Sequence, residues 1–362
     1  MSPFDKLRAA AIVGGPGSPE GLHYKGLHDK RLRDTRPRRS RVGLALVAVA
    51  LIGALAAPAL APHAADDSRG GLLNAPPTMV HVQDEGGWHA PFIYRWRLVN
   101  QLEQRYEEDR SARASLAWWS HGHLVESSDD ARAPLLWLGA DGYGRDVFSR
   151  LLFGARISLS LAAVASLGAM LIGALLGGVA GYAGGAVDEV LMRATDFVMV
   201  LPAMYVVLAL RAVLPPVLAS SVVFVLLAGI FALVGAPFIA RGVRAIVRTE
   251  RQLEYAVATK ALGASDARLL ARHLLPATAG FVAVEMTLLV PAFIVAEATL
   301  SYVGLGFPEP IASWGTMLHD ASNIRFADFP WLLSPAAAMF LVVLGLNLAL
   351  ESRRTAGLES LR

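Results

Sequence analysis

The sequence predicts an all-α membrane protein of about six transmembrane helices with a small mixed α/β extracytoplasmic insertion. Three observations predict it. The 362 residues are 54% hydrophobic and only 17% charged, whereas soluble domains carry about 25% charge. The apolar residues fall in long blocks, and basic residues concentrate in two of the segments between the blocks. This composition excludes a disordered chain, a nucleic-acid-binding tail protein and most soluble enzymes.

Six stretches lack or nearly lack charged residues. A bilayer core of ~30 Å needs about 20 apolar residues as a helix, and only a helix satisfies its own backbone in lipid. The third stretch is short but extensible past Asp196 and Arg211. The six are residues 42–61, 157–187, 197–210, 212–240, 274–308 and 329–350.

Charge then orients the bundle. Residues 1–41 carry ten Lys and Arg against four Asp and Glu, and residues 241–273 carry seven against three. Residues 62–156 carry ten basic residues against thirteen acidic ones. The positive-inside rule therefore places both termini in the cytoplasm and residues 62–156 outside.

The resulting organisation has five parts. A basic cytoplasmic segment (1–41) precedes the first transmembrane helix (42–61). This block has the rival interpretation of a signal peptide, but its apolar run is longer than a 7–15-residue signal core and about 40 residues precede it. The remaining parts are the insertion and entrance segment (62–156), a five-helix core (157–350) containing the cytoplasmic segment 241–276, and a cytoplasmic tail (351–362).

The insertion differs in composition from the rest. Residues 78–82 alternate like a strand, Gly86 and Gly87 predict a hairpin turn, and residues 100–113 are charged enough for an exposed helix or ordered loop. Its aromatic residues are expected to form a local core rather than a ligand cage. The insertion is either a cap that packs on a partner or a contact for a delivery protein or substrate.

Sites for catalysis or metal are not evident. Cysteine is absent, and His121 and His123 lack a third ligand nearby, so no metal site is expected. No phosphate-binding P-loop occurs, so this chain is expected to bind no ATP itself. Gly139, Gly142 and Gly144 predict a turn at the membrane entrance rather than a phosphate loop.

Two carboxyl groups fall inside the fifth apolar stretch. Glu285 lies about midway and Glu297 near the outer end. An unpaired carboxylate in hydrocarbon is costly, so both are candidates for the transport route. The alternative is that both form hydrogen bonds within the bundle.

Residues 241–276 carry the most specific pattern. Residues 254–262 favour a helix, Gly263 fits a left-handed helix end, and Ser265 or Asp266 fits the N-cap of a second helix. Pro276 ends that helix or opens the next transmembrane one. A short helix, a glycine turn and a second helix are therefore expected to project from the membrane.

These residues resemble a known family. The family is the permease subunit of binding-protein-dependent ABC importers, of the dipeptide/oligopeptide (peptide/nickel) C-subunit type. Its signature, Glu-Ala-Ala, three residues, Gly, nine residues and Ile-x-Leu-Pro, aligns on Gly263. The glutamate and isoleucine are replaced by Val257 and His273. Ala258, Gly263, Leu275 and Pro276 match the signature, whereas Val257 and Thr259 occupy the other two positions of its Glu-Ala-Ala. The flanking residues of the expected coupling segment are Glu254, Ala261, Leu262 and Asp266.

Other stretches carry the resemblance through residues 137–350. One is the entrance motif before the second helix, and another is Glu297 with the Leu-Ser-Tyr-Val-Gly-Leu-Gly run that starts at Leu300. The tail departs from the family pattern. The entrance motif includes Gly144, Arg145, Asp146, Arg150 and Arg156.

The resemblance implies the type I importer arrangement and a set of partners. A second homologous permease, one or two ATPases that bind ATP and Mg, an extracytoplasmic binding protein and the lipid bilayer are implied, and nucleic acid is not. The segment 241–276 would dock in the ATPase, with Glu254 substituting for the missing signature glutamate. The implied location is the bacterial inner membrane.

Peptides are the implied substrate, with nickel, glutathione or another small solute as the alternative. Two other classes stay open from the residues. A secondary transporter would need its own coupling-ion site and often inverted repeats, and none is seen. A membrane-embedded enzyme would need a nucleophile–base or metal constellation, and none is evident.

Overall fold

The computed structural model describes residues 40–84, 86–213, 218–322 and 328–359. Most of the basic segment 1–41 lies outside these residues, and so does the prediction that this segment is cytoplasmic. The chain divides into two compact units, one of residues 1–48 with 343–362 and the other of residues 49–342. Each is described by itself.

Four described helices are long and apolar enough to cross a membrane, instead of the six that the sequence predicts. They are α4 (Val147–Ala183), α7 (Ser220–Glu250), α11 (Ala279–Tyr302) and the stretch from η2 (Pro330–Leu333) into α13 (Ser334–Glu359). The first predicted span is a shorter apolar helix, Ser40–Leu55, followed by α3 (Ala57–Leu60), which has Pro58 in its first turn.

The third predicted span, residues 197–210, is not a single helix. Helix α5 (Gly185–Val200) ends before Pro202, and α6 (Ala203–Val213) begins after it. Leu201 has extended backbone angles, φ −77° and ψ 116°. A residue before proline is pushed out of the helical region, and proline donates no backbone hydrogen bond. The break therefore follows from Pro202.

The second predicted span begins ten residues earlier than expected. Asp146 caps α4, and its carboxylate accepts hydrogen bonds from the backbone N–H groups of Phe148 and Ser149. At 1.5 Å per residue the 37-residue helix is ~55 Å long, well beyond the ~30 Å hydrocarbon core. Part of α4 therefore extends out of the bilayer.

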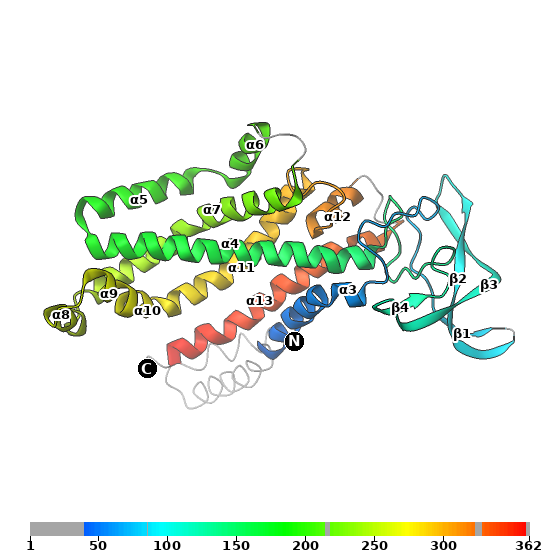
Figure 1. Cartoon of the computed structure of the whole chain (residues 1–362), viewed down its shortest axis with the longest axis horizontal. Coiled ribbons are helices and arrows are strands. Elements are labelled where there is room, and N and C mark those ends of the chain that lie inside the picture. The colour runs from blue at the N-terminus through cyan, green and yellow to red at the C-terminus, as the bar shows by residue number, and fades with distance from the viewer. Residues whose placement is uncertain (1–39, 85, 214–217, 323–327, 360–362) are drawn as a thin grey trace, which may run out of the picture. The chain divides into compact units, whose positions relative to one another are not determined.

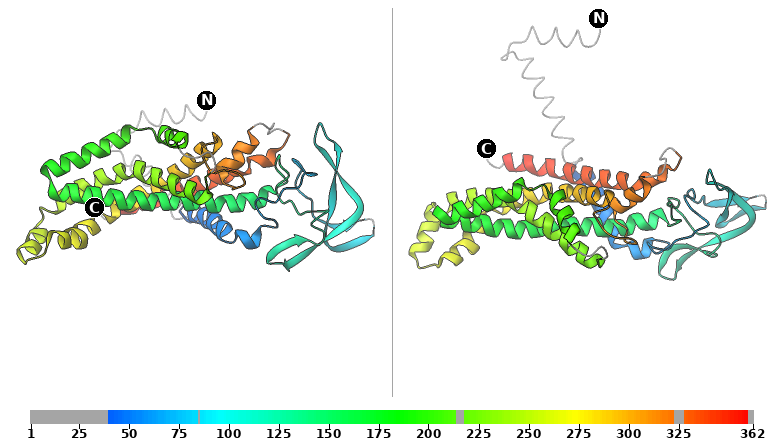
Figure 2. Two further views of the ribbon diagram at one scale, coloured as in Figure 1. Left: turned by 45° about the horizontal axis from the view of Figure 1, so that its top comes forward. Right: turned by 90° about the horizontal axis from the view of Figure 1, so that it is seen from above.

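Helices α4 and α7 pack along most of their lengths, as Figure 1 and Figure 2 show. Small residues make this possible. A Cβ added at Gly173, Gly177 or Gly181 would lie 2.3–2.7 Å from a backbone carbonyl oxygen of α7. Close approach through small residues is the usual basis of helix packing in membranes.

The insertion is an antiparallel sheet in the order β1-β2-β3-β4, not a mixed α/β unit. The strands are β1 (His81–Asp84), β2 (Gly87–Asn100), β3 (Arg105–Ser120) and β4 (His123–Ser127). The hairpin expected at Gly86 and Gly87 is confirmed. The helix or loop expected over residues 100–113 is wrong, because most of these residues pair between β2 and β3.

The core of the insertion includes an aliphatic cluster and the buried aromatic pair Phe92 and Tyr94, 3% and 8% exposed, whose rings pack edge to face. The expected aromatic core therefore holds for this pair, whereas Trp88, Trp118 and Trp119 are 78%, 60% and 76% exposed and lie outside it. Strands β2, β3 and β4 and the segment after β4 supply the aliphatic cluster. Its members are Ile93, Ala114, Val125, Ala133 and Leu135.

Candidate functional site

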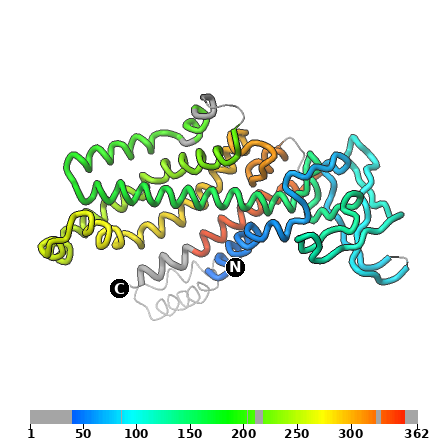
Figure 3. The backbone as a smooth tube through the Cα atoms, in the orientation of Figure 1, coloured from blue at the N-terminus to red at the C-terminus, as the bar shows by residue number. Residues whose placement is uncertain are grey.

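The segment after α7 forms two short helices joined by a glycine turn (Figure 3). They are α8 (Glu254–Ala261) and α9 (Asp266–Leu269). Gly263 has φ +88°, and the Ser265 hydroxyl accepts a hydrogen bond from the backbone N–H of Arg268. The predicted left-handed glycine and the Ser265 N-cap are both confirmed.

We call α8, the glycine turn and α9 the helical hairpin. One face of the helical hairpin is buried and the rest is exposed to solvent. Ala256 is 1% exposed, whereas Val257 and Leu262 are 58% and 89% exposed. Glu254, Ala258 and Ala261 are exposed as well. The Thr259 hydroxyl donates a hydrogen bond to the carbonyl oxygen of Tyr255, at 2.6 Å. The exposed surface therefore combines apolar side chains with small ones.

The glycine turn is tied to the end of α4. The Tyr182 hydroxyl donates to Asp266 Oδ1 at 2.5 Å, and Lys260 Nζ lies 3.1 Å from the same oxygen. These hydrogen bonds lower the pKa of Asp266. Arg251 donates to the carbonyl oxygen of Tyr182. We call Tyr182, Lys260 and Asp266 the turn clamp; of these, only Asp266 was among the candidates from the sequence.

The signature ends in an irregular helix. After α9 the chain passes through a π-helical segment, η1 (Leu270–Leu274), into α10 (Leu275–Ala277), which contains Pro276. Leu274 is fully buried, and a Cβ added at Gly178 of α4 would lie 3.0 Å from Leu275 Cδ2. Leu275 therefore packs against α4, which the sequence spacing alone does not predict.

The two acids of α11 differ in their surroundings. Glu297 is fully buried and accepts hydrogen bonds from the hydroxyls of Ser158 and Ser301, each at 2.7 Å. Ser158 Oγ also accepts from the backbone N–H of Trp314. Glu285 is half-buried. The bundle hydrogen-bonding alternative thus describes Glu297.

The entrance motif contributes to a buried ionic cluster. The Arg145 guanidinium contacts Asp141, Glu309 and Asp320 at 2.6–2.7 Å. Arg150, 1% exposed, donates to Asp320 at 3.1 Å. Burial and the nearby Glu309 raise the pKa of Asp320 to about 6, against the opposing effect of the two arginines. The sequence did not indicate that residues 309 and 320 complete this cluster.

The other residues of the motif have separate places. Gly144 has φ +76°, and a Cβ there would lie 2.1 Å from the carbonyl oxygen of Arg69. Asp146 lies 3.3 Å from His63 Nδ1, and His63 Nε2 lies 2.8 Å from Asp130. Arg156 is exposed and apart from the ionic cluster. It lines an apolar cavity of about 740 Å³.

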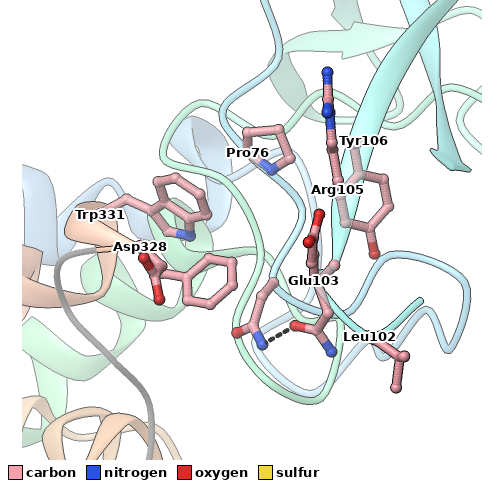
Figure 4. A pocket seen from close by; sticks show the side chains of 10 residues that line it. Pro76, Leu102, Glu103, Arg105, Tyr106, Asp328 and Trp331 are labelled. Atoms are coloured by element: carbon pink, nitrogen blue, oxygen red, sulfur yellow. Dashed lines mark hydrogen bonds between the residues drawn. The ribbon is translucent and has the colours of Figure 1, made fainter. Parts of the chain in front are cut away.

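A second cavity, of about 760 Å³, opens beside the β2–β3 loop (Figure 4). Asn74 and Gln104 are hydrogen-bonded on one side, and Asp328 and Trp331 lie on the other. Its charged lining residues are Glu103, Arg105 and Asp328. Within the described ranges no three His, Asp or Glu side chains are grouped as metal ligands would be.

The family model for binding-protein-dependent transport system inner membrane components matches residues 170–353. This range is half of the chain and contains the glycine turn, its clamp partners and α11. The chain belongs to this family. It is therefore an inner-membrane permease component of a transport system that works with a binding protein, and a non-catalytic one by family.

Individual relatives agree. The permease is 38% identical over 221 residues to the oligopeptide transport system permease protein OppC of Bacillus subtilis, covering 61% of this chain and 70% of that protein. It is 40% identical over 212 residues to DppC, the dipeptide transport system permease of the same organism, covering 58% and 64%. It is 36% identical over 220 residues to the glutathione transport system permease protein GsiD of Pectobacterium atrosepticum, covering 61% and 71%.

Proposed function

We propose that this permease forms part of the pathway for di- or oligopeptides in a bacterial ATP-driven importer and that α8 and its glycine turn dock on a cytoplasmic ATPase. The observation that carries the docking is the exposed hairpin. It presents Val257 and Leu262 outward and is held to α4 by the turn clamp.

The arrangement suits transmission of movement. The hairpin is continuous with α7 through a short turn and with α11 through η1 and α10. A push on the hairpin would therefore reach two candidate spans directly and α4 through Tyr182. Packed elements of this kind move between discrete arrangements rather than deforming continuously.

The remaining parts of the proposal follow the same architecture. A second homologous permease completes the pathway, an extracytoplasmic binding protein delivers the solute, and both termini are cytoplasmic. ATP and Mg belong to the ATPase. Glu254, exposed at the start of α8, supplies the carboxylate that Val257 lacks. Glutathione, nickel or another small solute is the alternative cargo.

Peptide is favoured because relatives named for oligopeptide and dipeptide transport show 38% and 40% identity. The cargo is tested by purifying the binding protein that co-purifies with the complex and identifying its ligand by mass spectrometry. Peptides support the proposal, and a metal ion or a sugar in their place contradicts the choice of cargo.

ATPase docking is tested by cross-linking, for which the chain is convenient because it has no cysteine. Val257→Cys and Val187→Cys compare the same substitution at sites 58% and 47% exposed, on α8 and α5. A benzophenone label on each is photolysed in native membranes. We expect a cross-link to an ATPase subunit from position 257 in clear excess over position 187. Equal yields, or an ATPase-free product from 257, would refute the docking.

A further inference from the structure

The end of the β3–β4 hairpin exposes two adjacent tryptophans. Trp118 and Trp119 are 60% and 76% exposed, at the point where Trp118 pairs with Val125 and Ser120 with His123. Successive residues of a regular strand point to opposite faces. Trp119 has φ +54°, which interrupts that alternation. Both indole rings are therefore free of the aliphatic core of the insertion.

This hairpin end lies beside the end of a membrane helix. His123 Nδ1 is 2.6 Å from the carbonyl oxygen of Ala61, the residue that caps α3. Figure 1 shows β4 next to α3. Helix α3 directly follows the apolar helix Ser40–Leu55. The tryptophans are thus fixed close to the place where the chain leaves the hydrocarbon.

The adjoining helix surface is apolar and exposed. Val49, Ile52 and Leu55 are 69%, 62% and 79% exposed, at a spacing of three residues that puts them on one side of the helix. Leu55 precedes Ala61 by six residues, a rise of ~9 Å if helical. The polar headgroup layer begins at the hydrocarbon boundary and adds roughly 5–8 Å on each side. With Leu55 at the hydrocarbon boundary, the hairpin end lies at the outer edge of the headgroup layer.

We propose that Trp118 and Trp119 insert into the interfacial layer of the bilayer and hold the insertion's sheet on the membrane surface. Tryptophan is enriched at this depth because its ring is apolar and its indole N–H forms hydrogen bonds. The hairpin end lies next to α3, which follows the exposed apolar residues Val49, Ile52 and Leu55. The partner is the phospholipid interface.

The proposal is separate from the family assignment. Residues 62–135 precede the range that the family model matches, 170–353, so the family gives this sheet no role. It also does not depend on which side of the membrane the sheet occupies, because both surfaces of a bilayer have an interfacial layer. Failure of peptide transport or of ATPase docking would leave it standing.

The test measures depth with spin labels. Single cysteines replace Trp119 and, as a matched control, Trp88, which is 78% exposed and pairs with Gln83 beside the β1–β2 turn. Figure 1 and Figure 2 place that turn at the edge of the sheet farther from the helices. The full-length protein, with any subunits that co-purify, is placed in phosphatidylcholine nanodiscs. Nitroxide collisions with oxygen and with a water-soluble nickel chelate are then compared.

Oxygen partitions into the bilayer and the chelate does not. We expect the oxygen-to-nickel accessibility ratio at position 119 to exceed that at position 88 at least fivefold. Equal ratios would overturn the proposal, and so would shielding of position 119 from both reagents, which indicates a protein contact.

A second measurement needs no cysteine. Brominated phosphatidylcholine quenches tryptophan fluorescence at short range. The Trp118→Phe/Trp119→Phe variant is expected to lose part of the quenching that the wild type shows, whereas Trp88→Phe is expected to lose none. Unchanged quenching in the double variant would contradict insertion even if the cysteine variants fail to fold.

Discussion

At the scale of single residues, the backbone conformation of Gly263 requires glycine, whereas the space around it does not. Its φ is +88°, yet a Cβ added there would meet nothing within 4 Å. Residues with a side chain lose roughly 1–2 kcal/mol in the left-handed region. Substitution at this position therefore acts through strain in the glycine turn.

Gly263→Val is expected to reduce transport at least about tenfold, the effect of ~1.4 kcal/mol on one equilibrium, while leaving membrane insertion intact. The control is Gly280→Val, because Gly280 is equally open but has no positive φ. Uptake assays in cells with matched expression give the comparison. Normal uptake by the Gly263 variant would remove the assignment of the coupling turn.

Tyr182 acts on the same turn from α4. Its hydroxyl holds Asp266, and it is also 3.4 Å from Lys260 Nζ. We predict that Tyr182→Phe lowers the amount of solute transported per ATP hydrolysed, because the turn then moves independently of α4. Basal ATPase activity should be retained.

The matched control for the Tyr182 variant is Tyr205→Phe, which removes the hydroxyl of a 68% exposed tyrosine on α6. Reconstituted complexes provide both transport and ATPase rates. A proportional fall in the two rates would indicate a structural defect and would contradict a positioning role.

At the scale of elements, the contact of α4 with α7 depends on glycine. We predict that Gly177→Ala destabilises the permease by about 1–3 kcal/mol, the usual cost of overpacking, because its Cβ would lie 2.3 Å from the carbonyl oxygen of Ala240. Gly229→Ala on α7 is the control, since nothing lies within 4 Å of a Cβ there. Thermal unfolding in detergent compares the two variants. Equal unfolding midpoints would contradict the claim that the contact of α4 with α7 depends on Gly177.

The helices and strands show which structural features could be predicted from the sequence and which could not. Apolar length and helix signals predicted α4, α7, α11 and the glycine turn, because burial in lipid and cap chemistry are local properties. Apolar content did not reveal that Pro202 divides the third stretch. Charge in residues 100–113 suggested an exposed helix or ordered loop, although strand pairing, which is non-local, decides the structure of most of them.

The candidate site shows the same division. Gly263 and Ser265 were predictable because a helix end demands particular residues. Tyr182, Glu309 and Asp320 were not singled out, because their partners lie 84, 164 and 175 positions away. Assignments of Val257, Leu275 and the other signature residues to ATPase coupling stay predictions.

At the scale of the whole molecule, His63 links the start of the insertion to the first turn of α4 through Asp130 and Asp146. Burial alone would lower the pKa of His63, but the hydrogen bonds to the two carboxylates outweigh it, so the pKa is raised. The protonated histidine therefore stabilises the fold. This contribution is complete below the unfolded pKa of ~6.5 and is lost as the pH rises through the folded value.

We predict that the unfolding temperature of the wild type falls between pH 6 and pH 9 more steeply than that of His63→Gln. Asp130, whose pKa is lowered, stays ionised through this range and adds no slope. Differential scanning fluorimetry at matched ionic strength measures the difference. Parallel curves would show that His63 does not titrate with folding.

The contacts at the two ends of helix α4 restrict insertions and deletions within it. Its N-terminal end bears Arg150 in the ionic cluster, and its C-terminal end bears Tyr182 in the turn clamp. One inserted or deleted residue between them would rotate one end by ~100° relative to the other and shift it by ~1.5 Å. The contacts of either Arg150 or Tyr182 would then face the wrong way. Lineages descended from this gene should therefore keep the number of residues between positions 150 and 182 constant, even where residue types outside the helix contacts change.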